Sequence, residues 1–224
     1  STTKATSCLI LHSWFYLMGR YTGPKNKIAR RFGMNLGLKS NATKVARRLS
    51  QPPGVHGPKK RHGTVSNFGK QLLEKQKAKF MYGIREHQFH NYVREATRRK
   101  GDSSLALQRM LEMRFDNVIY RSGFGITRAQ ARQMVTHGMF TVNGRLLDIA
   151  SYVVRVGDVI AVKANKAKKK LFDEASDRLS KQTLPSWLTV DPSQISVKIV
   201  SEPGEKDFEK AFDVKRIIEY YSAR

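Results

Sequence analysis

The chain has 224 residues, a formal net charge of +24 and a hydrophobic fraction of 40%, which together allow one large or two small domains with real cores and exclude a wholly disordered tail. A charge of this size favours a polyanionic partner, nucleic acid before an anionic membrane surface, and no apolar run is long enough to predict a membrane-spanning helix. The single cysteine, Cys8, excludes a disulfide framework and a cysteine-based zinc site and indicates a reducing compartment.

The positive charge is concentrated in the N-terminal half. Residues 18–100 hold 21 Lys and Arg against three Glu, whereas residues 101–224 hold 20 against 15 acids. A solvated face is the ordinary explanation of one basic run, but self-repulsion on this scale requires a counter-charge. We therefore expect the N-terminal half to supply most of the attraction to a polyanion.

Residues 1–17 fit poorly with the rest of the chain. The apolar run Cys8–Met18 is too short to cross a bilayer and lacks the flanks of a signal peptide. Because Met18 and the following GRYTGPK resemble a natural start, we expect residues 1–17 to be an upstream extension. A real anchoring arm is the alternative.

The segment Met18–His62 is rich in Gly, Pro and basic residues and poor in apolar ones. It cannot build its own core, so we predict an irregular arm that is ordered against a partner. His56 and His62 could suggest a metal ion, but two His without a nearby Cys or carboxylate make a weak site. We predict neither a metal nor another cofactor.

Residues 66–100 are predicted to form two helices separated by Gly83. Apolar stripes at helical spacing are interpreted as core rather than as base-stacking platforms. The basic residues fall mostly off these stripes, and we expect them to face outward toward phosphates. They are Lys70, Lys75, Lys77, Lys79, Arg94, Arg98, Arg99 and Lys100.

Residues 107–162 contain the densest set of local signals. Helical spacing continues from Leu107 to Ile119, and Thr127 with Gln130 forms a capping box for a second helix that Gly138 ends. Short strands are predicted at Met139–Val142, Tyr152–Val156 and Val159–Val162. Asn143-Gly144 between the first two indicates a type I′ hairpin turn.

Arg128 and Arg132 are four residues apart and are expected to share one outer face of the second helix. A cationic helical face of this kind can clamp phosphates and 2′-hydroxyls of RNA but cannot enter the deep major groove of an A-form helix. His137 and the Asn143-Gly144 turn could add hydrogen bonds. Helix solubility for the two arginines, and turn geometry alone for Asn143-Gly144, are the alternatives.

These residues resemble the RNA-binding module of ribosomal protein S-four of the small subunit. The shared motifs are Phe115–Arg121 (FDNVIYR), Gly123-Phe124, Thr127-Arg128, Ala131–Gln133, Val135, His137, Val142–Gly144, Ser151-Tyr152 and Gly157-Asp158. The resemblance to that protein continues outside the module at Arg20–Lys25 (RYTGPK), Pro52–Gly57 (PPGVHG), Leu72–Phe89, Pro185–Leu188 (PSWL) and Ile217–Ser222 (IIEYYS). It therefore covers nearly the whole chain from Met18.

The resemblance implies an α+β fold: a mostly helical N-terminal domain with a basic irregular arm, and an inserted module of two helices packed on a small antiparallel sheet. It implies an N-terminal rRNA-binding domain at 18–110, the module at 111–172, and a tail at 173–224 that packs on the N-terminal domain. The tail itself shows strand-like alternation at Ile195, Val197 and Ile199, and its seven acids between Asp191 and Glu219 suit a protein neighbour better than phosphate.

The family implies a structural, non-enzymatic protein that binds small-subunit (16S-type) rRNA early in assembly of the subunit body and contributes to translational accuracy. The implied surroundings are the neighbouring protein S-five, the channel through which mRNA enters, and the cytoplasmic ribosome of a bacterium in preference to an organellar one. The residues that we expect to contact RNA are Arg20, Tyr21, Pro24, Arg47, Arg48, Lys59, Arg61, Arg114, Arg121, Thr127, Arg128, Arg132, His137 and Asn143.

The chain departs from the family pattern at one site, and two other functions remain possible for its module. Asn26 and Ala29 stand where many members begin a Cys-based zinc site, so the chain resembles a zinc-free branch. An RNA-modifying enzyme of the pseudouridine synthase type could carry the same module, but no catalytic domain or phosphate-cradling loop is visible. A free-standing RNA-binding factor is the other alternative, and the RYTGPK and PPGVHG segments disfavour it.

Overall fold

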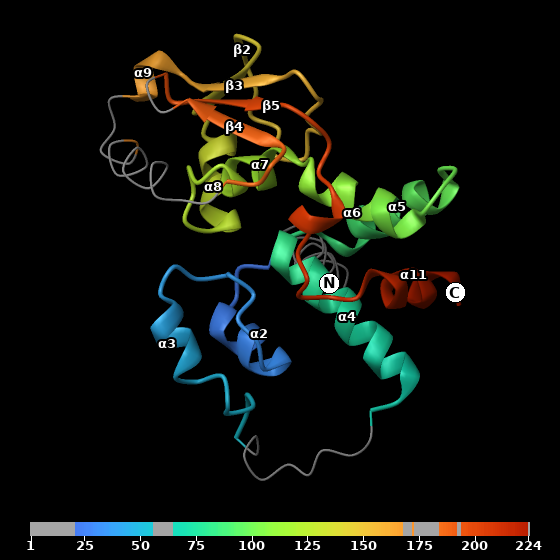
Figure 1. Cartoon of the computed structure of the whole chain (residues 1–224). Coiled ribbons are helices and arrows are strands. Elements are labelled where there is room, and N and C mark those ends of the chain that lie inside the picture. The colour runs from blue at the N-terminus through green and yellow to red at the C-terminus, as the bar shows by residue number, and fades with distance from the viewer. Residues whose placement is uncertain (1–20, 56–64, 168–171, 173–183, 192–193, 224) are drawn as a thin grey trace, which may run out of the picture.

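The computed structural model describes residues 21–55, 65–167, 172, 184–191 and 194–223, arranged in two packed halves (Figure 1). The first half is the helical domain, and its elements are α2 (Lys25–Phe32), α3 (Ala42–Ala46), α4 (Asn67–Tyr82), α5 (Glu86–Arg98), α6 (Ser103–Glu112) and α11 (Val214–Ser222). The second is the sheet domain, formed by α7 (Phe115–Arg121), α8 (Arg128–Thr136), α9 (Ala164–Ala167) and one five-stranded sheet. The α+β fold predicted from the sequence is confirmed.

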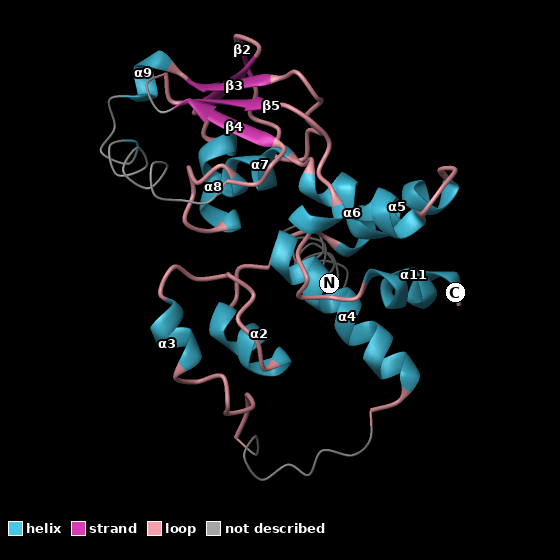
Figure 2. Cartoon of the chain, in the orientation of Figure 1, coloured by secondary structure: helices cyan, strands magenta, loops and turns pink. Residues whose placement is uncertain are grey.

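The sheet is antiparallel throughout, in the order β2-β1-β3-β5-β4 (Figure 2). Its strands are β1 (Phe140–Val142), β2 (Arg145–Leu146), β3 (Val159–Val162), β4 (Leu188–Asp191) and β5 (Ser196–Ile199). α7 and α8 cover one face, where Phe124, Phe140 and Trp187 are fully buried. The predicted strand at Val159–Val162 therefore forms at the expected residues, and the alternation at Ile195–Ile199 belongs to β5.

The tail divides between the two halves, which corrects the expectation that all of it packs on the helical domain. β5 pairs with β3, with Ile160 opposite Val197, so β4 and β5 complete the sheet. Only the last part returns to the helical domain, where α11 packs on α4, α5 and α6 and buries Ile217. Each half thus has its own core, and both cores need residues from the C-terminal tail.

The helices of the helical domain form where local signals place them. Ser66 caps α4 by accepting a hydrogen bond from the backbone N–H of Gly69. Gly83 ends the helix with φ +63°, and this end was predicted from the sequence. The aromatic stripe of α5 is core, since Phe89 and Val93 are buried. The arm, expected to be irregular, contains the short helices α2 and α3.

Two expected elements differ from the structure around Arg114. The predicted helix through Leu107–Ile119 breaks at Met113 and Arg114, and the predicted strand Tyr152–Val156 does not form. Both have the same cause: residues 113–116 and 150–154 hydrogen-bond to each other, with the N–H of Phe115 donating to the carbonyl of Tyr152 at 2.8 Å and the N–H of Val154 to that of Met113 at 3.0 Å. A tertiary pairing has replaced the local helical bonds.

Within the described residues, no helix is both long and apolar enough to cross a membrane.

Glu86, the first residue of α5, connects three helices of the helical domain. It accepts hydrogen bonds from Lys75 at 2.6 Å, Lys79 at 3.0 Å and the Tyr221 hydroxyl at 2.8 Å. Lys75 and Lys79 are thus turned toward this carboxylate, and Lys75 is buried, so the expectation that both face outward is wrong. Partial burial raises the pKa of Glu86, but these three donors outweigh it and lower the pKa from 4.5 to about 2.

We predict that this carboxylate makes folding acid-sensitive. Its pKa is lower in the folded than in the unfolded chain, so its contribution to stability is present above pH 4.5 and is lost as the pH falls from 4.5 toward 2. Glu86→Gln should make urea-unfolding stability less dependent on pH across this window. Glu205→Gln, at an exposed carboxylate, is the matched control and should leave the wild-type pH dependence in place.

Candidate nucleic-acid interface

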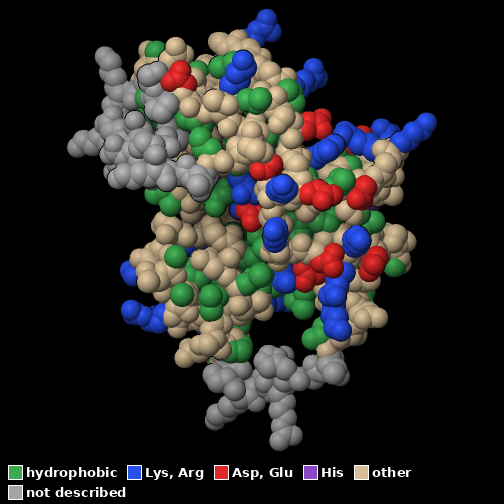
Figure 3. Space-filling model, viewed as in Figure 1, with side chains coloured by type: hydrophobic (Ala, Val, Ile, Leu, Met, Phe, Trp, Pro, Cys, Tyr) green, Lys and Arg blue, Asp and Glu red, His purple; other side chains and the backbone are tan. Residues whose placement is uncertain are grey.

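The arm carries positive charge and has no acidic residue of its own. Residues 21–55 contain eight Lys and Arg and no Asp or Glu. Arg31, Arg47 and Arg48 are exposed, and within the described part of the chain none of them has an ion-pair partner. The visible face of the arm in Figure 3 accordingly shows basic side chains without acidic neighbours, whereas the two signs lie together over α5 and α11.

The arm is nevertheless anchored, so its cations are presented by a defined backbone. Ile28 and Leu36 are buried in the helical core. Arg30 donates to the carbonyls of Gln51 at 2.7 Å and Pro52 at 2.9 Å, which fastens the end of the arm to α2. Asn41 caps α3 by accepting from the N–H of Lys44 at 2.9 Å.

Two of the predicted contact residues begin the described part of the arm. Tyr21 is 46% exposed and its ring lies edge-on to Phe80, with 5.5 Å between centroids. Pro24 precedes α2 and is exposed at its N-terminal end. Both are accessible to a ligand. Arg20, Lys59 and Arg61, predicted to contact RNA, and His56 and His62 lie outside the described residues.

Arg114, which was expected to contact RNA, is fully buried. Its guanidinium donates to Asp116 through Nε at 3.1 Å and through Nη2 at 2.8 Å, and to the Tyr92 hydroxyl through Nη1 at 2.6 Å. Burial lowers the pKa of Arg114, but Asp116 and Tyr92 outweigh it and raise the pKa above its ordinary value. The Arg114 side chain thus links the break between α6 and α7 to Tyr92 of α5.

Arg128 is also buried, at 8% exposure, and does not share an outer face with Arg132. Its guanidinium lies over the rings of Tyr120 at 4.4 Å and Tyr82 at 4.9 Å, and it donates to Glu209 at 2.7 Å. The helical spacing was correct, but α8 begins at the junction between the two halves, so its first turn faces protein.

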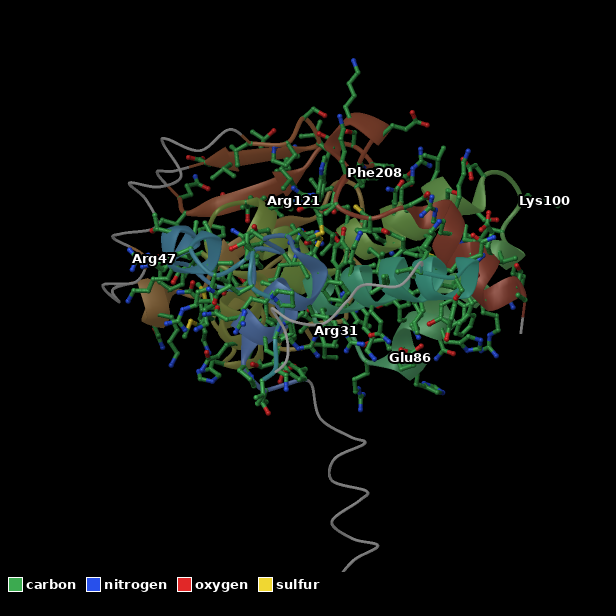
Figure 4. All side chains as sticks on the ribbon, turned by 90° about the horizontal axis from the view of Figure 1, so that it is seen from below. Arg31, Arg47, Glu86, Lys100, Arg121 and Phe208 are labelled. Carbon is green, nitrogen blue, oxygen red and sulfur yellow. The ribbon has the colours of Figure 1, made fainter. Side chains whose placement is uncertain are left out.

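Arg121 belongs to the same junction. It donates to Glu112 through Nε and Nη2, both at 2.9 Å, and lies 3.3 Å from Glu209. Figure 4 shows it inside the molecule near Phe208, with Arg47 at the outer edge. Burial lowers the pKa of Arg121, but Glu112 and Glu209 outweigh it and raise the pKa.

The remaining predicted residues of the sheet domain are accessible to different degrees. Arg132 is partly exposed and pairs with Asp116 at 3.0 Å. Thr127 caps α8, accepting from the N–H of Gln130 at 3.2 Å, while Gln130 accepts from Ile126 instead of the capping residue itself. His137, at the end of α8, is exposed.

Asn143 has a structural role. Its φ of +49° and that of +79° at Gly144 fit the predicted type I′ turn. Its side chain donates to Asp158 at 2.8 Å and accepts from the N–H of Val159 at 2.9 Å, which ties this hairpin to the Gly157-Asp158 turn. The turn residues are exposed, so their outer edge is open to a ligand.

Three acidic or aromatic partners of the junction were not predicted from the sequence. They are Tyr82, Glu112 and Glu209. Each of them bonds to a partner that is at least 30 residues away in the sequence. The tail acids had suggested a protein neighbour, but Glu202 pairs with Arg109 and Asp207 accepts from Ser186. A local excess of acids in a basic chain is a signal that could have pointed to such internal pairs.

In the described part of the chain, no three His, Cys, Asp or Glu side chains come together as a metal site. An open groove of about 570 Å³ lies between α5 and α6, lined by Asn91, Tyr92, Arg94, Glu95, Arg98 and Met110. Its carboxylate, Glu95, pairs with Arg98 at 3.1 Å. The groove thus carries an ion pair on an open surface. Its lining has a single carboxylate, whereas acid–base catalysis by carboxylates would need two.

Arg114 gives a direct test of whether the buried guanidinium is structural. Arg114→Met should lower the free energy of unfolding by about 2–4 kcal/mol, because Asp116 would lose one of its two arginine partners in a buried setting. Arg109→Met removes an exposed arginine with one ion pair and should cost less than about 1 kcal/mol. Urea denaturation measures both, and equal effects would contradict the structural role.

Comparison with known proteins supplies a family. Residues 20–112 match the model of the ribosomal protein S4/S9 N-terminal domain, and residues 113–160 match that of the S4 domain. Small ribosomal subunit protein uS4 of Roseiflexus castenholzii is 44% identical over 207 residues, covering 92% of this chain and 100% of the relative. The proteins of that name from Halorhodospira halophila and Methylibium petroleiphilum are 45% and 46% identical over 208 residues, with the same coverage.

Proposed function

Because the chain belongs to the family of small ribosomal subunit protein uS4, we propose that it is a structural, non-enzymatic constituent of the small ribosomal subunit that binds rRNA directly. The observation that carries the proposal is the separation of two kinds of cation. Arg31, Arg47 and Arg48 of the arm are exposed and have no ion-pair partner within the described residues, while arginines at the junction are paired within the protein. Unopposed cations on an anchored backbone are the groups that neutralise phosphates.

The contact residues that we propose are therefore fewer than the sequence suggested. Exposure supports Tyr21, Pro24, Arg47, Arg48 and His137, together with the partly exposed Arg132 and the outer edge of the Asn143-Gly144 turn. Arg20, Lys59 and Arg61 remain candidates on their sequence alone. Thr127 serves as a cap, and Arg114, Arg121 and Arg128 serve inside the protein.

The family resemblance supports a wider setting. We propose that the protein binds 16S-type rRNA early in assembly of the subunit body, lies beside protein S-five and near the channel through which mRNA enters, and contributes to decoding accuracy. A bacterial cytoplasmic ribosome is the proposed location, since the relatives named above are bacterial.

The alternatives proposed from the module alone have less support. A pseudouridine-synthase-like enzyme or a free-standing factor shares only the second matched segment. The match of residues 20–112 to the N-terminal domain of a ribosomal protein lies wholly outside that segment. It favours a ribosomal protein over both.

Binding to a transcript of small-subunit rRNA should depend steeply on salt, since each neutralised phosphate adds roughly 0.7–0.9 to the slope of log affinity against log salt. Arg47→Ala with Arg48→Ala should weaken binding and reduce that slope by between about 1 and 2. The matched control, Lys206→Ala with Lys210→Ala, removes two exposed cations from the tail and should leave the slope near the wild-type value. A wild-type slope near zero would refute the proposal.

We also expect the purified protein to contain zinc well below one equivalent per chain. Asn26 and Ala29 occupy the positions of the first two zinc cysteines of other members, and zinc sites in proteins need three or four Cys, His or acidic ligands. Elemental analysis after dialysis provides the measurement. One equivalent that survives a chelator would contradict the expectation, and His56→Ala with His62→Ala would then identify the ligands.

A further inference from the structure

We propose that Glu209 and Arg128 are positioning residues that fix the angle between the helical and sheet domains, and that they set the affinity for rRNA without touching it. The inference rests on the proposed rRNA binding. Its basis is a chain of bonds that crosses the boundary between the two halves of the molecule. Ion pairs link the two halves at this boundary, and each half has an apolar core of its own.

The bonds join α4, α6, α7, α8 and the tail. Tyr82 of α4 donates its hydroxyl to Glu112 of α6 at 2.6 Å, and Arg121 of α7 donates to the same carboxylate. Arg121 and Arg128 both reach Glu209 of the tail, at 3.3 and 2.7 Å. The set defined by these five residues is called the junction network below.

The junction network is balanced in charge and satisfied in its bonds. Two arginines face two carboxylates, and Asn117 links them by donating to Glu112 at 2.7 Å and accepting from Arg128 at 2.8 Å. Charged hydrogen bonds of this kind are directional, so a change in angle between the halves would strain several at once. Apolar side chains alone would permit sliding, because their attraction is non-directional.

Position in the chain strengthens the assignment. Glu209 follows the short 3-10 segment Glu205–Asp207, in the part of the tail that runs from β5 to α11. The carbonyl of Asp207 accepts from Arg121 at 3.2 Å. Glu209 therefore fastens the connection between the two halves at the point where it passes α7 and α8.

A direct RNA contact by Arg128 is the competing explanation of its place in the family motif. Its guanidinium is held between two tyrosine rings and a carboxylate, and the residue is 8% exposed. A phosphate would have to displace Glu209 to reach it. The proposed contact surfaces lie on both halves, so a loosely held angle lowers the fraction of molecules that can use both at once, and the apparent affinity falls by that fraction.

The experiment compares two substitutions that change net charge identically. Glu209→Gln and Glu202→Gln each remove one negative charge from the same stretch of tail, and Glu202 is exposed in an ion pair with Arg109. Simple attraction predicts that both variants bind an rRNA transcript equally or slightly more tightly. The proposed role predicts instead that Glu209→Gln alone binds at least fivefold more weakly, with an unchanged salt slope.

Tyr82→Phe keeps the ring and the net charge but removes the bond to Glu112, and should weaken binding about two- to fivefold, again without changing the salt slope. Residual dipolar couplings of the RNA-free proteins should show a broadened or altered angle between the halves in both weakened variants. If Glu209→Gln fails to fold, Tyr82→Phe decides the question by the same two measurements.

The outcomes separate this inference from the proposed function. Wild-type affinity and an unchanged angle in folded Glu209→Gln or, failing that, in Tyr82→Phe would overturn the positioning role while leaving rRNA binding intact. A salt slope reduced by about 0.7–0.9 in Arg128→Met would also overturn it, by making Arg128 a phosphate contact. A wild-type protein that does not bind rRNA would instead refute the proposed function, and the angle measurements would still report on the junction network.

Discussion

The carboxylate of Glu112 is the point on which the two halves of the molecule depend. It is 1% exposed and accepts hydrogen bonds from Tyr82, Asn117 and twice from Arg121. A buried carboxylate without such donors would be strongly unfavourable, so α4, α6 and α7 must meet in one arrangement for the chain to fold. The break between α6 and α7 and the buried Arg114 directly follow Glu112 in the sequence. The tail reaches the same region through Asp207 and Glu209, which both contact Arg121.

Positive charge serves two separate purposes in this chain. Around Glu112 and Asp116, each of the arginines is paired with a carboxylate at hydrogen-bonding distance. In the arm, the exposed Arg31, Arg47 and Arg48 have no ion-pair partner within the described residues, and residues 21–55 contain no acid. A free protein carries this self-repulsion as a cost, and a polyanion that neutralises the arm removes it. Arginine is suited to both settings because its planar donors pair with carboxylate or phosphate alike.

The parts of the fold that could be predicted are those encoded by neighbours in the chain. Gly83 ends α4, Thr127 starts α8 and Asn143-Gly144 turns the hairpin, because each signal acts within about four residues. The family resemblance added the function and the order of domains, which no spacing in the chain could provide. Neither the local signals nor the family resemblance specified which residues contact each other in the folded chain.

The errors share one physical cause. Helical spacing places Arg128 and Arg132 on one face but does not say whether that face meets water or Tyr82. Neither the strand expected at Tyr152–Val156 nor the unbroken helix expected through Arg114 forms. The backbones of the two segments bond to each other instead, as Phe115 does to Tyr152 and Val154 to Met113. The division of the tail between two cores likewise depends on the pairing of β5 with β3, which only the assembled sheet specifies.

That division of the tail has a consequence for synthesis of the protein. The sheet lacks its two final strands until Ile199 has been translated, and the helical core lacks Ile217 until α11 has followed. A nascent chain can therefore form isolated helices and the β1–β2 hairpin first, but it can close neither core before these tail segments have been made. During that interval its most basic segment, already emerged and without internal counter-charge, is exposed to every RNA surface nearby. Synthesis of the tail and closure of both cores are thus coupled in time, and both follow exposure of the basic segment.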